Sequence, residues 1–438
     1  MSTQDTNASR RNFLKTSSLL VAGGAVASSL NIAQAAHAYG SDTIKIGLIG
    51  CGGRGTGAAA QAMNTEGSVK LVAMGDVFPN KVQEAYRGLK GQYGDKVEVP
   101  KEKMFDGLDN YKKVLESDCD LVILATPPGF RPLHMEAAVK AGKHVFMEKP
   151  VAVDAPGVRR VLAATEEAKK KDLAVAVGLQ RRHERAYREI ISELQNGKIG
   201  EINFTRAYWN GAGVWVRPRR AGQTELEYQI NNWYYFNWLS GDHINEQHIH
   251  NLDVINWLKN GYPVKAQGQG GRQVRTGQEF GQIFDHHMVE FTYADGSKML
   301  SQCRHIPNTW SPVAEFAHGS LGTSDIGGGK IFDLKGKMVW QTKAGRDGHQ
   351  QEHHDLFADL RKGERPNEGE WGAKSTMTAI FGRMATYSGQ EISWEDAIGS
   401  KVNLCDTDKL ASFDSPAPIQ PDANGYYSVP VPGVTTEI

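Results

Sequence analysis

The sequence of 438 residues has only four cysteines, no excess charge of either sign and no internal repeat. Cys51, Cys119, Cys303 and Cys405 are scattered without a C-x-x-C pair, so we expect neither a cysteine metal site nor a disulfide framework, although one bridge stays open. Fifty basic residues balance fifty acidic ones, which argues against a surface for nucleic acid or an anionic membrane. After the first forty residues no stretch reaches 18 apolar residues, so no membrane-spanning helix is expected. The remaining chain, at 40% hydrophobic, suits two globular domains.

The first forty residues have the pattern of an export signal. Arg10 and Arg11 lie in the run SRRNFLK, a weakly apolar run over residues 18–32 follows, and small-residue sites come at 33–38. This pattern predicts a Tat signal peptide, passage through the Tat translocation machinery, and a periplasmic or otherwise exported protein. An uncleaved membrane anchor is the alternative. Because the Tat route carries folded proteins, it suits an enzyme that acquires a nucleotide in the cytoplasm.

The stretch TIKIGLIGCGGRGTG, which begins at Thr43, predicts a nucleotide site. Residues 44–49 are mostly apolar and predict a short buried strand, and the glycines after them predict a turn. Gly50, Gly52 and Gly55 fit the G-x-G-x-x-G pattern, and the small residues that follow suit a helix packed closely on a sheet. Backbone N–H groups at the start of such a helix attract a pyrophosphate.

An acidic residue at the end of the second strand should accompany such a loop. Residues 69–74 predict that strand, and Asp76 follows 26 residues after Gly50, near the spacing of roughly 20 expected for the residue that holds a ribose 2′-hydroxyl. Loop, spacing and acid together predict a dinucleotide site; the alternative is that Asp76 caps a turn. An acid there repels a 2′-phosphate and so favours NAD over NADP, although Arg54 in the loop softens this preference.

The alternation of strands and helices continues after Asp76. Helices are predicted over 80–91, 111–116 and 134–141, and strands over 121–125 and 144–147. Thr126 and Pro127 end the first of these strands abruptly. Since the carboxyl ends of parallel strands meet at the edge of a sheet where ligands bind, we expect both residues near the nucleotide.

The combination of GLIGCGGRG, Asp76, ATPP followed by His134, and GKHVFMEKP resembles the Gfo/Idh/MocA family, which is named after glucose–fructose oxidoreductase and inositol dehydrogenase. The resemblance extends over about residues 44–390, and EKP after a strand is its most specific mark. It implies an α/β protein with an N-terminal Rossmann domain, built on a doubly wound parallel sheet. A C-terminal α+β domain follows, whose open, mostly antiparallel sheet often forms oligomer contacts. The resemblance also implies that the lysine of EKP, Lys149, touches both nicotinamide and substrate.

The chemistry supports Lys149 independently of the family. Removal of a hydride from a secondary alcohol requires loss of the hydroxyl proton, and a cation beside the oxygen stabilises the developing alkoxide. A solvated surface lysine is the alternative. The residues expected to contact the cofactor are Gly50, Gly52, Gly53, Arg54, Gly55, Asp76, Thr126, Pro127, His134, Glu148 and Lys149.

The second domain is predicted to begin with a helix over 158–171 and a strand over 174–178. In the family the polar segment after this strand approaches the active site, so Arg181 or Arg182 is a candidate substrate ligand; a charged helix start is the alternative. Tyr208 is a further substrate candidate. It lies in the next predicted strand, which leads into a loop rich in glycine, tryptophan and arginine. Aromatic rings beside polar groups suit a sugar, but they suit a core or a subunit interface equally well.

The stretch GDHINEQHIHNLD contains the other catalytic candidates. If it forms one helix with the following VINWL, then His243, Glu246 and His250 lie on one face at i, i+3 and i+7. Family members place Asp four residues before a His followed by L-I-D. Here H-N-L-D assigns that His to His250, and Glu246 replaces the acid, which leaves the reach of its carboxylate open.

His250 is the candidate general acid/base, because an unperturbed imidazole titrates near neutral pH. His243 is a further substrate candidate. The alternatives are a helix-capping histidine and a metal site formed by His243, His248 and His250. We expect no metal, because His248 points away from the other two on such a helix.

Beyond Pro263 the sequence predicts a sheet of short strands, with a hairpin turn at Asp295-Gly296. His286 and His287 are interpreted as ordinary loop histidines. Helices over 352–362 and 373–388 close the domain, and the proline-rich tail is an extended strap or a disordered end. The predicted segments are a signal peptide (1–40), an NAD-binding domain (41–155), a substrate and oligomerisation domain (156–400) and the tail (401–438).

These observations favour a nicotinamide-dependent oxidoreductase that removes a hydride from a ring carbon of a sugar, glycoside, sugar acid or cyclitol. Two alternatives stay open: a glycosidase or epimerase that oxidises a ring carbon transiently and then returns the hydride, and a binding protein without turnover. Related glycosidases often lack the lysine of EKP, so Lys149 favours net oxidation. Because an exported enzyme meets essentially no free NAD, we expect the cofactor to be tightly bound. We also expect a homo-oligomer.

Overall fold

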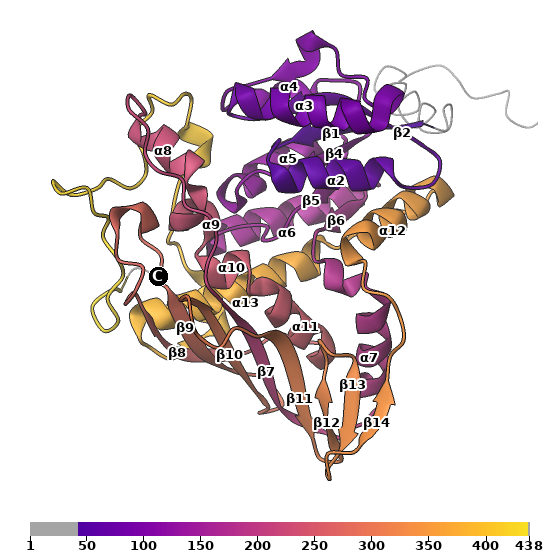
Figure 1. Cartoon of the computed structure of the whole chain (residues 1–438), viewed down its shortest axis with the longest axis vertical. Helices are drawn as coiled ribbons and strands as arrows, with labels where there is room; N and C mark the ends of the chain where they lie inside the picture. Colours follow the sequence, from indigo (N-terminus) through magenta and orange to yellow (C-terminus); the bar gives the residue numbers. More distant parts are fainter. Residues whose placement is uncertain (1–42, 437–438) are drawn as a thin grey trace, which may run out of the picture. The chain divides into compact units, whose positions relative to one another are not determined.

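The computed structural model describes residues 43–436 (Figure 1). The predicted signal segment with Arg10 and Arg11 lies outside the described residues, so the Tat assignment stays a prediction. Within residues 43–436 no helix is both long enough and apolar enough to cross a lipid bilayer. All four cysteines are free.

Sheet A has six parallel strands in the order β3-β2-β1-β4-β5-β6. Their bounds are β1 (Thr43–Ile49), β2 (Ser68–Gly75), β3 (Met104–Phe105), β4 (Leu121–Leu124), β5 (His144–Met147) and β6 (Val175–Val177). Every residue of β4 and β6 is buried, because helices cover both faces of the sheet, and this explains their continuous apolar runs. The predicted doubly wound parallel sheet is confirmed. β6 extends this sheet past residue 155, where the sequence placed the domain boundary.

Helices from two parts of the chain cover sheet A. On one face α4 (Asn110–Leu115), α5 (Arg131–Lys140) and α6 (Ala155–Lys170) share a core cluster, and on the other α2 (Gly53–Met63) and α3 (Pro79–Tyr93) share a second one. Leu356 and Phe357 of the late helix α12 (Gly348–Lys362) belong to this second cluster, and α12 lies against α2 (Figure 1). The last third of the chain therefore helps to cover the first sheet.

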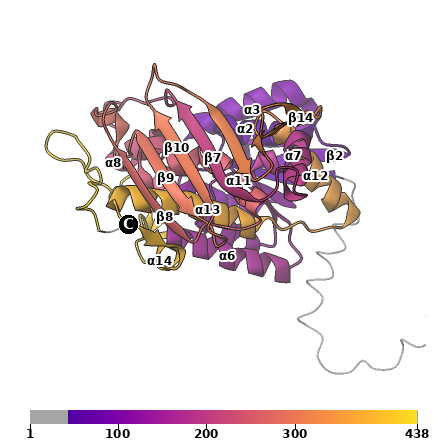
Figure 2. The same cartoon turned by 90° about the horizontal axis from the view of Figure 1, so that it is seen from below.

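Sheet B has nine strands in the order β14-β13-β12-β11-β7-β10-β9-β8-β15. All recorded neighbours are antiparallel except β7 and β10. α11 (Ile249–Lys259) and α13 (Gly369–Ser388) cover one face (Figure 2). The predicted open, mostly antiparallel sheet is confirmed. Its strands are β7 (Ile202–Gly211), β8 (Lys265–Gly271), β9 (His286–Thr292), β10 (Lys298–His305), β11 (Val313–Gly319), β12 (Gly322–Asp325), β13 (Lys330–Asp333), β14 (Met338–Gln341) and β15 (Ile392–Ser393).

Two further segments pack together beside sheet A. We call residues 212–236, which contain α8 (Glu225–Asn231), the cover segment, and residues 401–436 the tail. Their apolar side chains form one cluster with Phe78 and Phe130 of the first domain. Thr224 and Gln229 of the cover segment donate hydrogen bonds to backbone oxygens of the tail, at 2.7 and 2.6 Å. The tail is thus an extended strap over the cover segment (Figure 1). The remaining helices are α7 (Arg185–Gln195), α9 (Asn237–Ser240), α10 (His243–Glu246) and α14 (Trp394–Gly399).

Candidate functional site

The loop between β1 and α2 requires glycine at two positions. Gly50 has φ +99°, a conformation that favours glycine, and a Cβ there would lie 2.6 Å from the carbonyl carbon of Ala125. A Cβ on Gly55 would lie 1.9 Å from the backbone oxygen of Gly50. At Gly52, in contrast, a Cβ would meet nothing within 4 Å. α2 begins at Gly53 without a side-chain cap or an acidic residue in its first turn, so its first N–H groups are available to an anion.

A cavity lies at the carboxyl ends of β1, β2 and β4, and it contains six of the predicted cofactor residues. Its lining includes Gly50, Gly52, Asp76, Thr126, Pro127 and His134. Gly53, Arg54 and Gly55 form the adjoining start of α2. Glu148 and Lys149 follow β5 and are not among the lining residues of this cavity. The structure therefore brings the predicted loop and strand ends together.

The cover segment closes part of the same cavity, which the sequence did not predict. It contributes Arg217, Ile230, Asn231 and Trp233 to the lining. The guanidinium of Arg217 lies over the ring of Trp215, 4.5 Å from its centroid. The only sequence signal for this role was the density of tryptophan and arginine in the loop after β7, which fits a binding surface and a core equally well.

Hydrogen bonds hold two of the cavity residues in place. The Asp76 carboxylate accepts the N–H groups of Cys51 (2.7 Å) and Phe78 (3.0 Å). Burial raises the pKa of Asp76, and these two bonds oppose the rise. His134 Nδ1 lies 3.1 Å from Thr126 Oγ1, and burial lowers the pKa of His134 to about 3, so its ring is neutral at physiological pH.

Lys149 is fixed by Glu246 at the carboxyl edge of sheet A. Its Nζ lies 2.9 Å from Glu246 Oε1 and also donates to the backbone oxygen of Glu246. The two side chains are 13% and 15% exposed, so solvent screens this pair only partly. Glu246 therefore reaches Lys149, which settles the question raised by its replacing an aspartate. A cation held by two oxygens of one residue has a defined position.

A second ion pair joins the glycine loop to the end of β5. Arg54 Nε lies 2.8 Å from Glu148 Oε1, and the Glu148 side chain is buried. Arg131, also buried, donates to the backbone oxygens of Thr126 and Pro150. The residues that follow β4 and β5 are thus tied to α2 and α5 and form one rigid edge.

His250 lies in the first turn of α11, close enough to this edge for the charges there to shift its pKa. Its ring stacks on Trp209 with centroids 5.9 Å apart. Burial, together with the positive charges of Lys149 and Arg181, lowers the pKa of His250 well below its usual value. At physiological pH the ring is therefore neutral and can accept a proton.

The predicted single helix through this motif is wrong. α10 ends at Glu246, and α11 begins at Ile249 after a break. His243, Glu246 and His250 therefore do not share a helical face. Glu246 bonds Lys149, and the charge of Lys149 acts on His250. Glu246 and His250 therefore both lie near Lys149 at the carboxyl edge of sheet A, which we call the active edge.

His243 and His248 lie away from His250. His243 is buried and stacks on His305, with centroids 4.2 Å apart. His248 Nε2 lies 2.8 Å from Ser301 Oγ. A metal site formed by His243, His248 and His250 therefore has no support, and His243 has no surface to offer a substrate.

Both arginines predicted to meet substrate are bound to acids of the protein. Arg181 forms an ion pair with Glu315, which is fully buried. Arg182 holds Asp253 with a bidentate contact of 2.8 to 3.1 Å. Arg181 adds positive charge near His250, and its Nη1 is the nitrogen that binds Glu315.

The aromatic residue beside the active edge is Trp209 and not Tyr208. Successive side chains of a strand point to opposite faces. Trp209 stacks on His250, whereas the Tyr208 ring meets Trp310, with centroids 5.4 Å apart, on the other face of β7. Tyr208 was one of the residues predicted to contact substrate.

A histidine of α12 was missed entirely. His349 is exposed at the start of α12, and its charge acts on His250. Partial burial and the charge of Arg54 lower the pKa of His349. No local motif links α12 to the glycine loop, so only the fold could place this side chain near Lys149.

Comparisons with known proteins agree with this geometry. Residues 44–178 match the Gfo/Idh/MocA family, described as an oxidoreductase family with an NAD-binding Rossmann fold. The inositol 2-dehydrogenase of Rhizobium meliloti (strain 1021) is 27% identical over 283 residues, which cover 64% of this chain and 74% of that protein. The inositol 2-dehydrogenase of Salmonella paratyphi B is 27% identical over 219 residues, which cover 50% of this chain and 55% of that protein.

Solved structures share the fold. A myo-inositol 2-dehydrogenase from Lactobacillus plantarum has a TM-score of 0.62 at 22% identity and covers 80% of this chain and 99% of its own. An aldose–aldose oxidoreductase from Caulobacter crescentus has a TM-score of 0.64 at 18% identity with the same coverage. A scyllo-inositol dehydrogenase from Lactobacillus casei with bound NAD(H) and scyllo-inositol has a TM-score of 0.60 at 20% identity and covers 80% and 99%. The family match and the dehydrogenase relatives support an NAD-dependent oxidoreductase acting on CH–OH groups.

Proposed function

We propose that this chain, with the NAD-binding Rossmann fold of residues 44–178, is a dehydrogenase that oxidises a ring CH–OH group of a cyclitol or sugar. One observation carries the proposal: the Lys149 ammonium is fixed by Glu246 beside the neutral base His250, at the sheet edge next to the nucleotide cavity. The names of the sequence relatives, inositol 2-dehydrogenases, favour a cyclitol as the first substrate class to test.

The cavity residues fit a dinucleotide. Gly52 has open space where a side chain would stand, and the uncapped start of α2 offers N–H groups to a pyrophosphate. Asp76 provides a carboxylate for a ribose diol and a charge that disfavours a 2′-phosphate, so we assign NAD and not NADP. Bound NAD supplies the hydride acceptor.

Lys149, His250 and Glu246 have separate roles in the oxidation of the alcohol. Lys149 places a positive charge where the alcohol oxygen becomes negative, which favours the developing alkoxide. His250 accepts the hydroxyl proton, because burial and two nearby cations keep its ring neutral. Glu246 acts through Lys149: its two oxygens orient the ammonium.

Absorbance of the reduced nicotinamide tests this function. Purified protein is incubated with NAD and a panel of inositols, aldoses and sugar acids, and we expect NADH to grow with at least one cyclitol or sugar. The Lys149→Ala variant should form NADH roughly 10² times more slowly, or slower still, at the same concentration. A panel without any NADH formation, with a variant that behaves like the natural chain, would overturn the assignment of a net dehydrogenase.

The enclosed cavity also favours a second candidate, in which the hydride returns to the substrate within the same turnover. The cover segment lies over the nucleotide cavity and is held by the tail, which favours a cofactor that stays bound. A glycosidase or epimerase of this kind would release a new sugar without net NADH, and chromatography of the reaction mixture would detect that product.

Export and assembly belong to the proposal as well. The twin arginines at 10 and 11 support Tat export to the periplasm, where a retained NAD would be an advantage. The uncovered face of sheet B supports a homo-oligomer. Cell fractionation and light scattering of the purified chain would test these two statements.

A further inference from the structure

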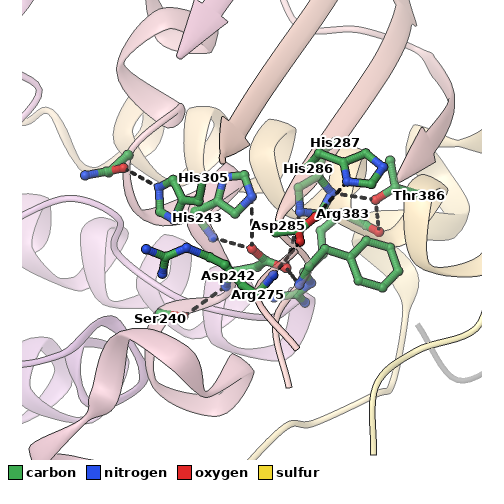
Figure 3. Close-up of polar contacts among 12 residues, drawn as sticks. Ser240, Asp242, His243, Arg275, Asp285, His286, His287, His305, Arg383 and Thr386 are labelled. Carbon is green, nitrogen blue, oxygen red and sulfur yellow. Dashed lines mark hydrogen bonds and ion pairs between the residues drawn. The ribbon is translucent and has the colours of Figure 1, made fainter. Parts of the chain in front are cut away.

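A second group of polar side chains is buried beneath α10, apart from Lys149 and His250 (Figure 3). Asp242 precedes α10, His243 is its first residue, and His287 lies on β9. All three are at most 2% exposed. One ligand atom from each lies within 4.8 Å of the other two. His287 was predicted to be an ordinary loop histidine, but it lies on β9, which brings it to Asp242.

The hydrogen bond at the far side of the His287 ring determines what faces Asp242. His287 Nδ1 lies 2.9 Å from Thr386 Oγ1, and that hydroxyl donates its one proton to the backbone oxygen of Arg383 or Gly382. With Nδ1 as the donor to this hydroxyl, the neutral ring has a lone pair on Nε2. In that tautomer Nε2, which lies 3.2 Å from Asp242 Oδ2, faces a second acceptor, and a proton or a metal ion between the two atoms relieves their repulsion.

His243 also has unpaired ring nitrogens, and one of them lies near the other oxygen of the Asp242 carboxylate. Neither of its ring nitrogens has a hydrogen-bond partner among the described residues, and Nε2 lies 3.8 Å from Asp242 Oδ1. A buried nitrogen without a partner costs roughly 1–3 kcal/mol. A proton on His287 would resolve only the contact between His287 and Asp242 and would leave His243 unpaired. One metal ion ligated by all three side chains would pair Nε2 of both histidines with the Asp242 carboxylate and would leave only His243 Nδ1 without a partner.

The surroundings of Asp242 orient its carboxylate as metal sites require. Its φ of 72° and ψ of 164° are rare for a residue with a side chain, a departure that costs about 1–3 kcal/mol and persists where other contacts enforce it. The N–H of Phe284 (3.0 Å) and the hydroxyl of Tyr387 (2.6 Å) donate to Oδ2. Metal-ligating carboxylates and imidazoles commonly have such outer hydrogen bonds, and Thr386 provides the one for His287.

We propose that Asp242, His243 and His287 bind one divalent cation of the zinc class. Two imidazoles and a carboxylate suit zinc and neighbouring first-row metals, whereas calcium and magnesium prefer oxygen ligands only. Ligands 2.0–2.1 Å from a tetrahedral ion are about 3.3 Å apart. His287 Nε2 lies 3.2 Å from Asp242 Oδ2, and His243 Nε2 lies 3.8 Å from Oδ1, the other oxygen of the same carboxylate. The buried guanidinium of Arg383 lies nearby (Figure 3), so the ion is held by its ligands and not by a general negative field.

The ion has a structural role for the active edge. Asp242 and His243 begin α10, and Glu246 at the end of α10 holds Lys149. Ligation of both residues to His287 of β9 would fix the start of this four-residue helix against sheet B. The proposal stands apart from the dehydrogenase assignment, because the ion touches neither substrate nor cofactor.

Elemental analysis of the full chain tests the site. Protein purified without a metal-affinity step should retain about one zinc-class ion per chain after extensive desalting. The His287→Gln variant should lose it, and so should His243→Gln. The matched control is His286→Gln, whose half-exposed ring bonds Asp285 outside the cluster, and this variant should keep the ion.

Cobalt provides a readout that does not depend on the variants being stable. Chelator-treated natural protein, given Co²⁺ and desalted, should show the visible absorption bands of a tetrahedral site. The proposal is wrong if the natural chain retains no metal and takes up neither Zn²⁺ nor Co²⁺. It is equally wrong if His286→Gln loses metal to the same extent as His287→Gln, because the ion would then be an adventitious one at the surface.

Discussion

At the scale of single residues, Lys149 has the most direct consequence for turnover. Its ammonium is fixed by two oxygens of Glu246 where an alkoxide would develop. Lys149→Ala should therefore lower turnover by roughly 10² or more, a typical cost of losing one group that stabilises developing charge. Cofactor affinity should stay near that of the natural chain. Stopped-flow turnover and NAD titration measure both, and Lys140→Ala, an exposed change on α5, is the control. Near-normal turnover of Lys149→Ala would contradict the role.

His250 leads to a prediction about pH. Burial, Lys149 and Arg181 depress its pKa well below 6.5, so the ring is neutral and able to accept a proton above that lowered pKa. Activity should thus be flat from neutral pH down to about 6.5 and fall only at lower pH, as His250 becomes protonated. His250→Gln should lower kcat by roughly 10²–10⁴ and remove this acid limb. A limb centred at or above pH 6.5, or one that persists in the variant, would exclude His250 as the base.

At the scale of elements, the start of α2 depends on the close approach of Gly55 to Gly50. Gly55→Ala would place a Cβ 1.9 Å from the Gly50 oxygen and displace the loop that faces the pyrophosphate. We expect NAD binding to weaken at least about tenfold, or roughly 1.4 kcal/mol. Gly57→Ala is the matched control, because its Cβ would meet nothing closer than Arg54 at 4.0 Å. Calorimetric titration of both variants compares them, and equal affinities would show that the loop tolerates the shift.

The docking of α12 should depend on pH through His183. Nδ1 of this ring lies 2.8 Å from Asp355 of α12, and Nε2 lies 3.2 Å from Glu368. Burial opposes the charged form, but the two carboxylates raise the pKa of His183 to about 9. A raised pKa stabilises the folded state below the unfolded value near 6.5, and this gain is lost as pH rises towards 9.

Urea unfolding should therefore show the free energy of unfolding falling by about 2–3 kcal/mol between pH 6.5 and 9. His183→Gln should remove most of this slope, whereas His354→Gln on α12 should leave it. The same slope in His183→Gln would mean that other groups cause it.

The elements that the sequence predicted are those whose signal is local. β1, β2, β4 and β5 are short apolar runs bounded by turn residues, and helices cover both of their faces. The break between α10 and α11 could not be predicted from the local sequence pattern. The break lies at Gln247 and His248, whose side chains contact His305 and Ser301 of β10, far along the chain. The histidine cluster escaped prediction for the same reason, since strand pairing brings His287 to Asp242.

At the scale of the whole molecule, three distant parts of the chain enclose the nucleotide cavity. The glycine loop and the strand ends form its floor, and the cover segment adds Arg217 and Trp233. The tail lies over the cover segment, where Arg219 Nη2 lies 3.0 Å from the hydroxyl of Tyr427, and that hydroxyl lies 2.6 Å from Glu225. Release of a dinucleotide would therefore require the cover segment and the tail to move together.

This arrangement predicts that NAD stays with the protein through purification. Denaturing the desalted natural chain should release close to one NAD per chain, because the cover segment slows dissociation more than the loop alone would. Replacing both Arg217 and Trp233 by alanine removes two lining side chains and should leave well under one nucleotide per chain, with activity restored by added NAD. Arg220→Ala is the matched control, since this exposed arginine of the same segment pairs with Glu227 and does not line the cavity. If the natural chain releases little NAD and depends strictly on added cofactor, retention is wrong. If the double variant retains as much NAD as the natural chain, then the glycine loop and the strand ends hold the cofactor and the cover segment does not.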